Sequence, residues 1–382
     1  MKICFIAPAD NYHTIKWSTW FCKHGHQVHI VSFTKGSIDG CMVHFVDSGA
    51  DVHGGDGQKL KYLLQAPKVH RIVKAIRPDI INVHYATSYG TVAALANLPP
   101  YILSVWGSDV YDFPRKSVLH KLMLQFSLSK AALLFSTSVA MAQEASKYTK
   151  KKFEITPFGV DCELFSPDKT RKKQYNEVDT KNGRDFVIGT VKSLSDKYGI
   201  TTLLRATALL KNEHPEIPVQ LRIAGKGPQE KEYKELARKL GIESITHWLG
   251  FISQDQAAVE WANMDCAIIP SESESESFGV SAVEAQACGT PVIISDVPGL
   301  MEATKPGVTS VVVPRGSAQA IAAAINKLYE EKSDREELGE NGRGFIVKQY
   351  ELNYCFNHVE RLFVTFLAEK KSSKSDSSGL IL

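Results

Sequence analysis

Short apolar runs alternate with helix-length amphipathic stretches along most of the chain, and this alternation predicts parallel βα units. An apolar run at 2–7 leads through a polar stretch at 10–13 into a helical pattern that continues to Lys23, and another apolar run follows at 27–33. The same pattern predicts further strands at 78–83, 101–107 and 132–138, and helices at about 58–76, near 89, at 115–129 and at 139–147. The first part of the chain therefore predicts an open parallel sheet with helices on both faces.

A second βα series begins at 186 and predicts another doubly wound sheet of similar size. Its strands are expected at 186–191, 219–225, 246–251, 265–270, 291–296 and 310–314. Residues 166–185 carry almost no aliphatic side chains and add little to a core, so we expect a linker there. The predicted organisation is an N-terminal domain at 1–168, a linker at 169–185, a C-terminal domain at 186–345, a helix at 346–370 that packs back on the first domain, and a flexible tail at 371–382.

Charge is nearly balanced over the whole chain but not within its halves. The 382 residues include 45 Lys and Arg against 42 Asp and Glu, which gives a net charge of +3 and predicts no nucleic-acid partner. Residues 1–170 carry 19 basic and 13 acidic side chains, and residues 171–382 carry 26 and 29, so the halves have charges of +6 and −3. The first half is the basic one.

Cysteine usage and hydropathy favour a cytoplasmic protein. Seven cysteines are spread along the chain without a C-x-x-C pair, which disfavours a zinc ribbon or a disulfide framework. The apolar run at the N-terminus is too short for a signal peptide, and no window reaches the roughly 18 uncharged apolar residues of a membrane-spanning helix. We therefore expect any membrane contact to be peripheral.

Carboxylates and a glycine cluster after the predicted strand at 265–270. The segment Glu-Ser-Phe-Gly at 276–279 follows, and a helix begins at its end. Gly279 lets the backbone approach a ligand closely, and the first amides of the helix predict a phosphate site. Glu284, about two helical turns further on, suits a diol such as ribose. The alternative interpretation is an acidic surface loop followed by an ordinary helix glutamate.

Glu276 and Glu284 lie eight residues apart, and A-C-G-T-P-V-I follows at 287–293. This segment resembles the signature of the retaining glycosyltransferases of family 4, which has E-x-F-G-aliphatic, a second Glu eight residues after the first, and A-x-G-x-P-V. Further segments resemble that family at 79–84, 105–109, 135–138, 157–167, 189–199, 223–228, 249–251 and 269–271. The resemblance covers about 1–345 and implies the GT-B fold, in which two Rossmann-like domains face each other across a central cleft.

The resemblance also implies roles for two lysines. Lys192 and Lys197 stand where the family has Arg and Lys. A preorganised cation in a dry cleft stabilises a leaving diphosphate more in the transition state than in the ground state. Lys192 keeps the charge of Arg but lacks its bidentate fork. Solvated surface side chains are the alternative interpretation for both lysines.

The metal and donor expectations follow from the same segments. No Asp-x-Asp motif follows a strand of the first sheet, so we predict no catalytic metal, and no cofactor beyond the nucleotide-sugar substrate. The resemblance implies retention of anomeric configuration by attack on the same face. The predicted catalytic residues are Glu276, Lys197, Lys192 and Asp109, and the predicted donor- or nucleotide-binding residues are Glu284, Ser277, Phe278, Gly279, Val280, Gly225 and Phe251.

Two positions in the first half depart from the family pattern. Trp106 stands where many relatives have a His that contacts the transferred sugar, and it either stacks on a sugar or is a core aromatic at a strand end. Asp109 is an acceptor-side base, a ligand of a sugar hydroxyl or a helix cap. The first loop lacks the two glycines of many relatives, and its His13 is either a base or a positioning residue. The predicted acceptor-binding residues are Asp10, Asn11, His13, His84 and Trp106.

We therefore predict a hexosyl- or N-acetylhexosaminyltransferase. It would move a sugar from a UDP- or GDP-linked donor to a hydroxyl of a glycan or of a lipid-linked glycan. The alternatives are another GT-B enzyme, such as a nucleotide-sugar epimerase, and a catalytically silent partner that binds a nucleotide-sugar or a glycan. The sequence leaves the sugar, the base, the acceptor and the oligomeric state open.

Two basic stretches in the first half bear on the acceptor. Residues 59–77 and 115–130 interleave Lys and Arg with large apolar residues. Such stretches either lie on an anionic membrane that holds a lipid-linked acceptor or are ordinary amphipathic helices that cover a sheet. The first interpretation would bring the protein to the inner face of the membrane.

Overall fold

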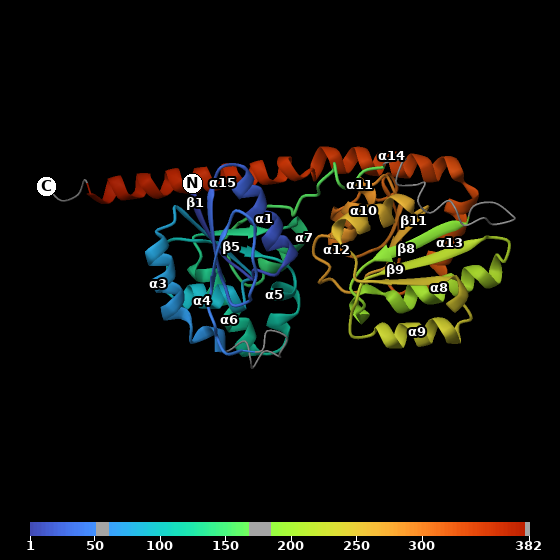
Figure 1. Cartoon of the computed structure of the whole chain (residues 1–382), viewed down its shortest axis with the longest axis horizontal. Coiled ribbons are helices and arrows are strands. Elements are labelled where there is room, and N and C mark those ends of the chain that lie inside the picture. The colour runs from blue at the N-terminus through green and yellow to red at the C-terminus, as the bar shows by residue number, and fades with distance from the viewer. Residues whose placement is uncertain (51–60, 168–184, 379–382) are drawn as a thin grey trace. The chain divides into compact units, whose positions relative to one another are not determined.

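The computed structural model describes residues 1–50, 61–167 and 185–378, with side chains up to residue 370. The chain forms two compact units (Figure 1). Unit 1 comprises Met1–Phe158 and Cys355–Leu382, and unit 2 comprises Gly159–Tyr354. The predicted linker at 169–185 lies almost entirely outside the described residues.

The described residues of unit 1 form a seven-stranded parallel sheet of order β3-β2-β1-β4-β5-β6-β7. Its strands are β1 (Lys2–Ile6), β2 (Gln27–Ser32), β3 (Met42–Phe45), β4 (Ile80–His84), β5 (Ile102–Val105), β6 (Leu133–Ser136) and β7 (Phe153–Ile155). Its helices are α1 (Tyr12–Lys23), α3 (Ala66–Ile76), α4 (Ser88–Leu95), α5 (Ser108–Tyr111), α6 (Val118–Lys130) and α7 (Val139–Ala145), with a 3-10 turn η1 (Phe113–Arg115). The central strands are buried on both faces, as their continuous apolar runs predict.

Unit 2 repeats this architecture with a six-stranded parallel sheet in its described part, of order β10-β9-β8-β11-β12-β13. Its strands are β8 (Phe186–Val191), β9 (Val219–Ala224), β10 (Thr246–Gly250), β11 (Cys266–Ile269), β12 (Val292–Ser295) and β13 (Ser310–Val313). Its helices are α8 (Ile200–Glu213), α9 (Glu230–Lys239), α10 (Gln254–Asn263), α11 (Val280–Ala287), α12 (Pro298–Glu302), α13 (Ala318–Glu330) and α14 (Lys332–Gln349), with 3-10 turns η3 (Asp196–Tyr198) and η4 (Glu243–Ile245). The structure confirms the prediction of two doubly wound α/β sheets.

Two short edge strands were not predicted. Strand β3 is half-exposed along its whole length, and the three residues of β7 follow a lysine run. An edge strand is covered less than a central one, so it does not need the continuous apolar run that marks the other strands. Pairing with β2 and with β6 creates these two strands.

The first segment of unit 1 ends at Phe158, ten residues before the predicted end of the N-terminal domain at 168, and unit 2 begins at Gly159. The backbone of Val160 pairs with the segment after α14, through its amide to the carbonyl of Tyr350 at 2.8 Å and through its carbonyl to the amide of Leu352 at 2.9 Å. The guanidinium of Arg343 donates to the carbonyls of Cys162 at 3.0 Å and Phe165 at 2.8 Å. These hydrogen bonds attach 160–165 to unit 2.

The last helical stretch is also divided differently from the prediction. Helix α14 ends at Gln349, and a separate helix α15 (Leu352–Ser378) follows. From Cys355 onward α15 belongs to unit 1, where Phe356 packs edge-on against Trp17 with ring centroids 5.1 Å apart, and Phe363 stacks on Phe21 at 5.4 Å. The residues before 355 stay with unit 2 because Val160 pairs with them.

The two basic stretches of the first half differ in which side chains they bury. In α3, Val69, Val73 and Ile76 face the core, and Arg71 and Lys74 are exposed, as in an ordinary amphipathic helix. In α6, large apolar side chains are exposed instead: Val118 is 75% exposed and Leu119 65%. Lys59 and its neighbour at 60 lie outside the described residues.

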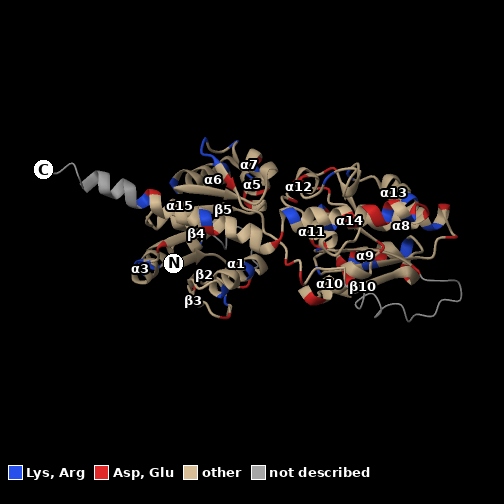
Figure 2. Cartoon of the chain, turned by 90° about the horizontal axis from the view of Figure 1, so that it is seen from above, with Lys and Arg blue, Asp and Glu red and all other residues tan. Residues whose placement is uncertain are grey.

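Charged residues are distributed without one dominant sign on the helices of unit 2. In α9, for example, Lys and Arg are interspersed with Glu (Figure 2). Within the described part of the chain, no helix combines the length and the apolar character that crossing a membrane requires.

Candidate active site

The strand order of unit 2 reverses between β8 and β11, which are neighbours in the sheet. In open parallel sheets, ligands bind beyond the carboxyl ends of the strands at such a switch point. Lys192 comes directly after β8, and the loop 270–279 comes directly after β11. The predicted catalytic residues of unit 2 therefore follow the two strands where a ligand site is expected.

Lys192 and Glu276 form a buried ion pair at this point. The Nζ atom of Lys192 lies 2.5 Å from Oε2 of Glu276, and the two side chains are 12% and 8% exposed. The Ser271 hydroxyl donates to the same carboxylate oxygen at 3.3 Å. Burying either charge alone would be costly, and each neutralises the other. The structure thus brings together two residues that the sequence assigned separately to catalysis.

Tyr198 connects the two predicted cations. Its ring centroid lies 4.5 Å from Nζ of Lys192 and 5.0 Å from Nζ of Lys197. An aromatic face attracts ammonium groups, so Tyr198 holds both near one place. Sequence reasoning missed this residue, although its position directly after Lys197 was a usable signal.

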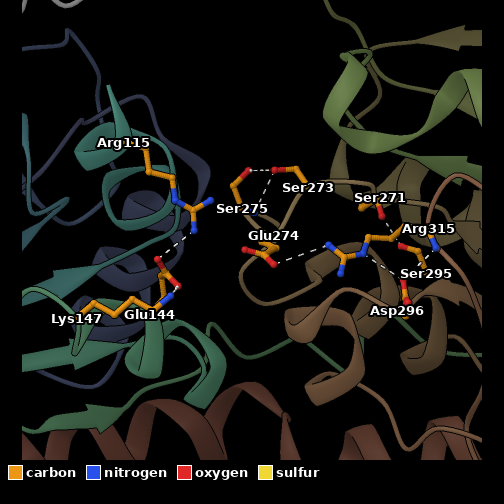
Figure 3. A network of polar contacts seen from close by, with 10 residues as sticks. All are labelled: Arg115, Glu144, Lys147, Ser271, Ser273, Glu274, Ser275, Ser295, Asp296 and Arg315. Atoms are coloured by element: carbon orange, nitrogen blue, oxygen red, sulfur yellow. Dashed lines mark hydrogen bonds and ion pairs between the residues drawn. The ribbon is translucent and has the colours of Figure 1, made fainter. Parts of the chain in front are cut away.

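The three alternating glutamates after β11 have three different partners. Glu272 accepts a hydrogen bond from the Thr202 hydroxyl at 2.6 Å. Glu274 lies 3.9 Å from the guanidinium of Arg315, which also pairs with Asp296 at 3.2 Å (Figure 3). Only Glu276 of the three pairs with Lys192. The loop is therefore not a uniform acidic surface.

The backbone of this loop is held in place as well. The amides of Glu272 and Ser273 donate to the carbonyl of Lys197 at 2.9 and 3.2 Å. The Ser295 hydroxyl donates to the carbonyl of Ser271, as drawn in Figure 3. Sequence reasoning missed Arg315, Asp296 and Ser295, because they come from segments far along the chain that only the fold brings to the loop.

Helix α11 begins beside the ion pair. Gly279 has φ +74°, a left-handed conformation that favours glycine, and an added Cβ there would lie 2.7 Å from Cδ2 of Leu300. No side chain of the described residues caps this helix. The Ser281 hydroxyl donates to the carbonyl of Val191 at 2.8 Å and ties the first turn to the end of β8. The helix N-terminus, with its positive end, thus lies at the same switch point.

The other predicted donor residues on this segment are mostly buried. Glu284 in α11 accepts a hydrogen bond from the indole Nε1 of Trp261 at 3.4 Å. Ser277 and Phe278 are buried, and Val280 is half-buried. Phe278 packs edge-on against Tyr350 at 5.3 Å, which makes it a core contact within unit 2. Trp261 was not predicted and positions the Glu284 carboxylate.

The glycine turn after β9 passes directly over Lys192. Gly225 has φ +137°, and an added Cβ would lie 1.9 Å from the carbonyl oxygen of Lys192. Its amide donates to the carbonyl of Gly250 at 2.6 Å, which places the ends of β8, β9 and β10 next to one another. Phe251, the next residue, is 76% exposed. An exposed aromatic ring here can stack on a planar group.

In unit 1, Asp109 is a buried structural carboxylate. It is 2% exposed and accepts hydrogen bonds from the amides of Ala86 at 2.8 Å, Gly107 at 2.8 Å and Trp106 at 3.1 Å. Burial raises the pKa of Asp109, and these backbone hydrogen bonds oppose the rise. Because the carboxylate joins the loop after β4 to the loop after β5, we replace the expectation of a catalytic base by a positioning role.

Trp106 lies in a cluster of aromatic rings. It is 7% exposed, and its ring centroid lies 4.3 Å from that of His84, 5.0 Å from Tyr85, 5.4 Å from Phe158 and 5.8 Å from His13. Of the two interpretations of Trp106, this packing favours the core aromatic. The residues Tyr85 and Phe158 were missed by sequence reasoning.

His84 lies wholly inside unit 1. It has no exposed surface, and its Nε2 lies 2.9 Å from Oδ1 of Asn82. Burial lowers the pKa of His84 to about 3, so the ring is neutral near pH 7. A side chain without exposed surface does not contact an acceptor, and His84 is therefore removed from the acceptor set.

The first loop separates its polar residues. Asn11 caps α1, since its Oδ1 accepts hydrogen bonds from the amides of His13 at 2.9 Å and Thr14 at 3.4 Å. His13 is half-buried and stacks on Phe158 with ring centroids 3.8 Å apart. Asp10 is exposed. Asn11 thus has a structural role, while Asp10 and His13 remain candidates for acceptor contact.

Among the residues that the structure describes, no group of three or more His, Cys, Asp or Glu side chains is arranged to hold a metal ion. The groups gathered at the switch point of unit 2 are two ammonium ions, one carboxylate and a helix N-terminus. This arrangement suits a ligand with two negative charges rather than a divalent cation.

Two family models match the chain. The model for glycosyl transferases group 1 matches residues 171–345, and the glycosyl transferase 4-like model matches residues 2–138. All predicted site residues lie within these two ranges.

Proteins of similar sequence are named as glycosyltransferases. D-inositol 3-phosphate glycosyltransferase of Pseudarthrobacter chlorophenolicus is 31% identical over 55% of this chain and 50% of that protein. The chain thus spans about half the length of this relative. The capsular polysaccharide biosynthesis glycosyltransferase CapM of Staphylococcus aureus is 26% identical over 91% of this chain and 92% of that protein.

Solved structures share the fold over nearly the whole chain. Sucrose-phosphate synthase from Thermosynechococcus elongatus matches with a TM-score of 0.84 and 19% identity, covering 97% of this chain and all of that one. Anabaena Alr3699/HepE in complex with UDP matches with a TM-score of 0.80 and 18% identity, covering 96% of this chain and all of that one. At these identities the likeness concerns the fold alone.

Proposed function

This chain belongs to the group 1 glycosyltransferases of the GT-B fold, and we propose that it transfers a sugar from a nucleotide-diphosphate donor to a hydroxyl group, with retention of anomeric configuration. The donor would be a UDP- or GDP-sugar, and the acceptor a glycan or a lipid-linked glycan. The observation that carries the proposal is the Lys192–Glu276 ion pair beside the N-terminus of α11. The ammonium group of Lys197 lies over the ring of Tyr198, as does that of Lys192.

The diphosphate would bind at the N-terminus of α11. The helix amides and the two ammonium groups supply positive charge there. Lys192 is neutralised by Glu276 before the donor binds, so Lys197 would attract the diphosphate first, and Lys192 would be shared between phosphate and carboxylate. Glu276 would then accept a hydrogen bond from a hydroxyl of the donor sugar, which keeps its buried charge satisfied.

The nucleoside end of the donor would lie nearer to Glu284 and the glycine turn. A carboxylate accepts hydrogen bonds from both hydroxyls of a ribose, and the Trp261 indole orients that of Glu284. The exposed ring of Phe251 suits stacking on the base. Anabaena Alr3699/HepE, which shares the fold, binds UDP in its solved complex, and this agrees with a uridine nucleotide as one of the two proposed donors.

The reaction would need no base from unit 1. The bond between the anomeric carbon and the phosphate oxygen breaks, and the acceptor oxygen forms a bond to the same face of that carbon. The acceptor proton passes to the departing phosphate oxygen, which serves as the base. Lys192 and Lys197 stabilise the charge that develops on that phosphate, so we propose that no catalytic metal is required.

A donor panel tests this function. Purified full-length protein is incubated with UDP- and GDP-linked hexoses and N-acetylhexosamines, with and without EDTA, and release of the nucleoside diphosphate is followed. Slow hydrolysis of one donor that persists in EDTA supports a metal-independent transferase, and thermal shifts with UDP and GDP identify the base. Binding without turnover, even with glycan acceptors, would indicate a catalytically silent protein, and loss of activity in EDTA would contradict the metal-independent mechanism.

We further propose that α6 lies on an anionic membrane that carries the acceptor. Val118, Leu119 and Leu122 are 75%, 65% and 55% exposed and share one face of the helix. Lys116 and Lys121 are exposed beside them. Large apolar side chains are rarely gathered on an exposed helix face, and flanking cations favour anionic lipid by about 1 kcal/mol each.

Vesicle sedimentation tests this surface. The protein should bind vesicles with anionic lipid more strongly than vesicles of neutral lipid, and binding should weaken with salt. Replacing Val118, Leu119 and Leu122 together by Ser should abolish binding. The control Val308→Ser, at an exposed position of unit 2, should leave it unchanged. Equal binding of the triple variant would contradict a role of α6.

A further inference from the structure

Two of the seven cysteines differ from the rest. Cys22 and Cys41 are half-buried, whereas the other five, Cys4, Cys162, Cys266, Cys288 and Cys355, are buried. The Sγ atoms of Cys22 and Cys41 lie 2.8 Å apart, although 19 positions separate the residues in the sequence. Spacing along the chain gave no hint of this pair, because it has no C-x-x-C pattern.

The pair joins two elements of unit 1. Cys22 lies in the last turn of α1, and Cys41 directly precedes β3. The Cys22 thiol also lies 3.3 Å from the carbonyl of Gly40, whose φ of +76° belongs to the turn that presents Cys41. The amide of Cys41 closes that turn by donating to the carbonyl of Ile38 at 3.0 Å. Backbone structure on both sides thus directs the two thiols toward each other.

A small oxidant can reach the pair. A surface pocket of about 530 Å³ opens beside Cys22 and is lined by residues of α1 and of the loop 37–40. None of the five buried cysteines lines this pocket. Access and proximity therefore coincide at one pair of thiols.

We propose that Cys22 and Cys41 form a reversible disulfide that fastens the C-terminal end of α1 to the loop before β3. A disulfide has a sulfur–sulfur distance of about 2.05 Å, so the two sulfur atoms need to approach by less than about 1 Å. This modification site is independent of the proposed transferase activity.

The chemistry balances with a disulfide such as oxidised glutathione as the oxidant. The Cys22 thiolate attacks glutathione disulfide, forms a mixed disulfide and releases one glutathione. The Cys41 thiolate then attacks Sγ of Cys22 and releases the second glutathione. Burial and the hydrogen bond with Cys22 raise the pKa of Cys41, so the second step becomes faster as the pH rises and more thiolate forms.

The disulfide would restrict α1 from its C-terminal end. Asn11 caps the other end of this helix, and His13 in its first turn stacks on Phe158. Oxidation would thus fix both ends of the helix that carries His13, one of the two remaining acceptor-contact candidates. Reduction would leave only the N-terminal attachment and the packing of the helix.

Thiol counting tests the proposal on the full chain. The reduced protein is equilibrated with glutathione and its disulfide at increasing oxidising ratios, denatured, alkylated with N-ethylmaleimide and weighed by mass spectrometry. We expect the number of alkylated cysteines to fall from the seven in the sequence by two, without a glutathione adduct. A tryptic digest should contain residues 17–23 joined to residues 36–59, and dithiothreitol should separate them.

Variants and thermal unfolding sharpen the test. Cys22→Ser and Cys41→Ser should each prevent the loss of two alkylation sites, while Cys288→Ser, at a buried position, should leave it intact. Oxidation of the unmodified protein should raise the unfolding midpoint by roughly 5 °C, an increase that both Ser variants should lack. Seven alkylated cysteines at every ratio, or glutathione adducts without the joined peptides, would overturn the proposal.

Discussion

The two units have the same kind of sheet but use the ends of their strands differently. In unit 2, the positions after β8 and β11 hold a charged pair, Lys192 and Glu276, in contact with each other. In unit 1, the positions after β4 and β5 hold aromatic rings around Trp106 and a carboxylate, Asp109, that binds backbone amides. A polar residue after a strand is therefore not by itself a site residue, because its hydrogen bonds can all serve the loop that carries it.

The largest effect should come from the charged pair. Lys192→Met or Glu276→Ala should lower kcat for donor hydrolysis by about 10³-fold, since each removes a preorganised charge next to the leaving diphosphate. Lys192→Arg should retain most of the activity, because the cation is kept. The control Lys239→Met changes an exposed side chain of α9 and should have no effect.

Breaking a buried pair also leaves one charge unsatisfied, so urea unfolding must accompany the kinetics. The double variant Lys192→Met with Glu276→Gln restores neutrality and should be at least as stable as either single variant. An unchanged rate in Glu276→Ala would remove the catalytic assignment of the pair. The same result would mean that the residues after the strands of unit 2 are structural, as those of unit 1 are.

In unit 1, the corresponding substitution should affect stability instead of donor binding. Trp106→Ala removes a ring that packs against four others, and we expect a loss of about 3 kcal/mol in the free energy of unfolding. Urea unfolding measures this loss, and Trp106→Phe should recover most of it. The thermal shift caused by UDP or GDP should persist in both variants. Normal stability combined with lost turnover would instead make Trp106 a substrate contact.

The pH dependence of stability tests the buried imidazole of unit 1. The pKa of His84 is about 3 when folded and near 6.5 when unfolded, so the unfolded chain binds more protons between these values. The contribution of the neutral His84 ring to the free energy of unfolding is therefore fully present above pH 6.5 and is lost as the pH falls toward 3. We expect a decrease of about 2 kcal/mol between pH 7 and pH 5 from this group.

Chemical denaturation at several pH values measures that decrease. The variant His84→Gln, which does not titrate in this range, should show a correspondingly flatter profile. The comparison variant His214→Gln changes a half-exposed histidine of unit 2 and shows how much of the flattening is particular to the buried ring. If the free energy of unfolding of His84→Gln falls with pH as steeply as that of the unmodified protein, the His84 ring is reached by water in the folded state.

The smallest effect should come from the arginine that holds the glutamate loop. Arg315→Ala removes the contacts with Glu274 and Asp296, and we expect a few-fold increase in KM for the donor with a smaller change in kcat. Arg315→Lys should restore part of the affinity. The matched control is Arg238→Ala, which removes an exposed arginine that pairs with Glu235 on α9 and should leave the KM for the donor unchanged. Equal KM values in all three variants would show that the loop keeps its geometry without Arg315.

Sequence and structure agree best where the chain has continuous apolar runs. The central strands of both sheets, the glycines at 225 and 279 and the helix that begins at 280 were predictable, because burial on both faces and positive φ angles demand particular residue types. The edge strands β3 and β7 and the unit boundary at Gly159 were not. They depend on pairing with distant segments, and no local pattern records that pairing.

For the site, the sequence alone determined which residue types follow which strands, and hence the family and the candidates Lys192, Lys197 and Glu276. The tertiary structure decided which of them meet. It paired Lys192 with Glu276, placed Tyr198 under both lysines, and turned Asp109 inward to three amides. The physical reason is that charge and glycine content are properties of single positions, whereas burial and hydrogen-bond partners arise only when separate segments of the chain pack together.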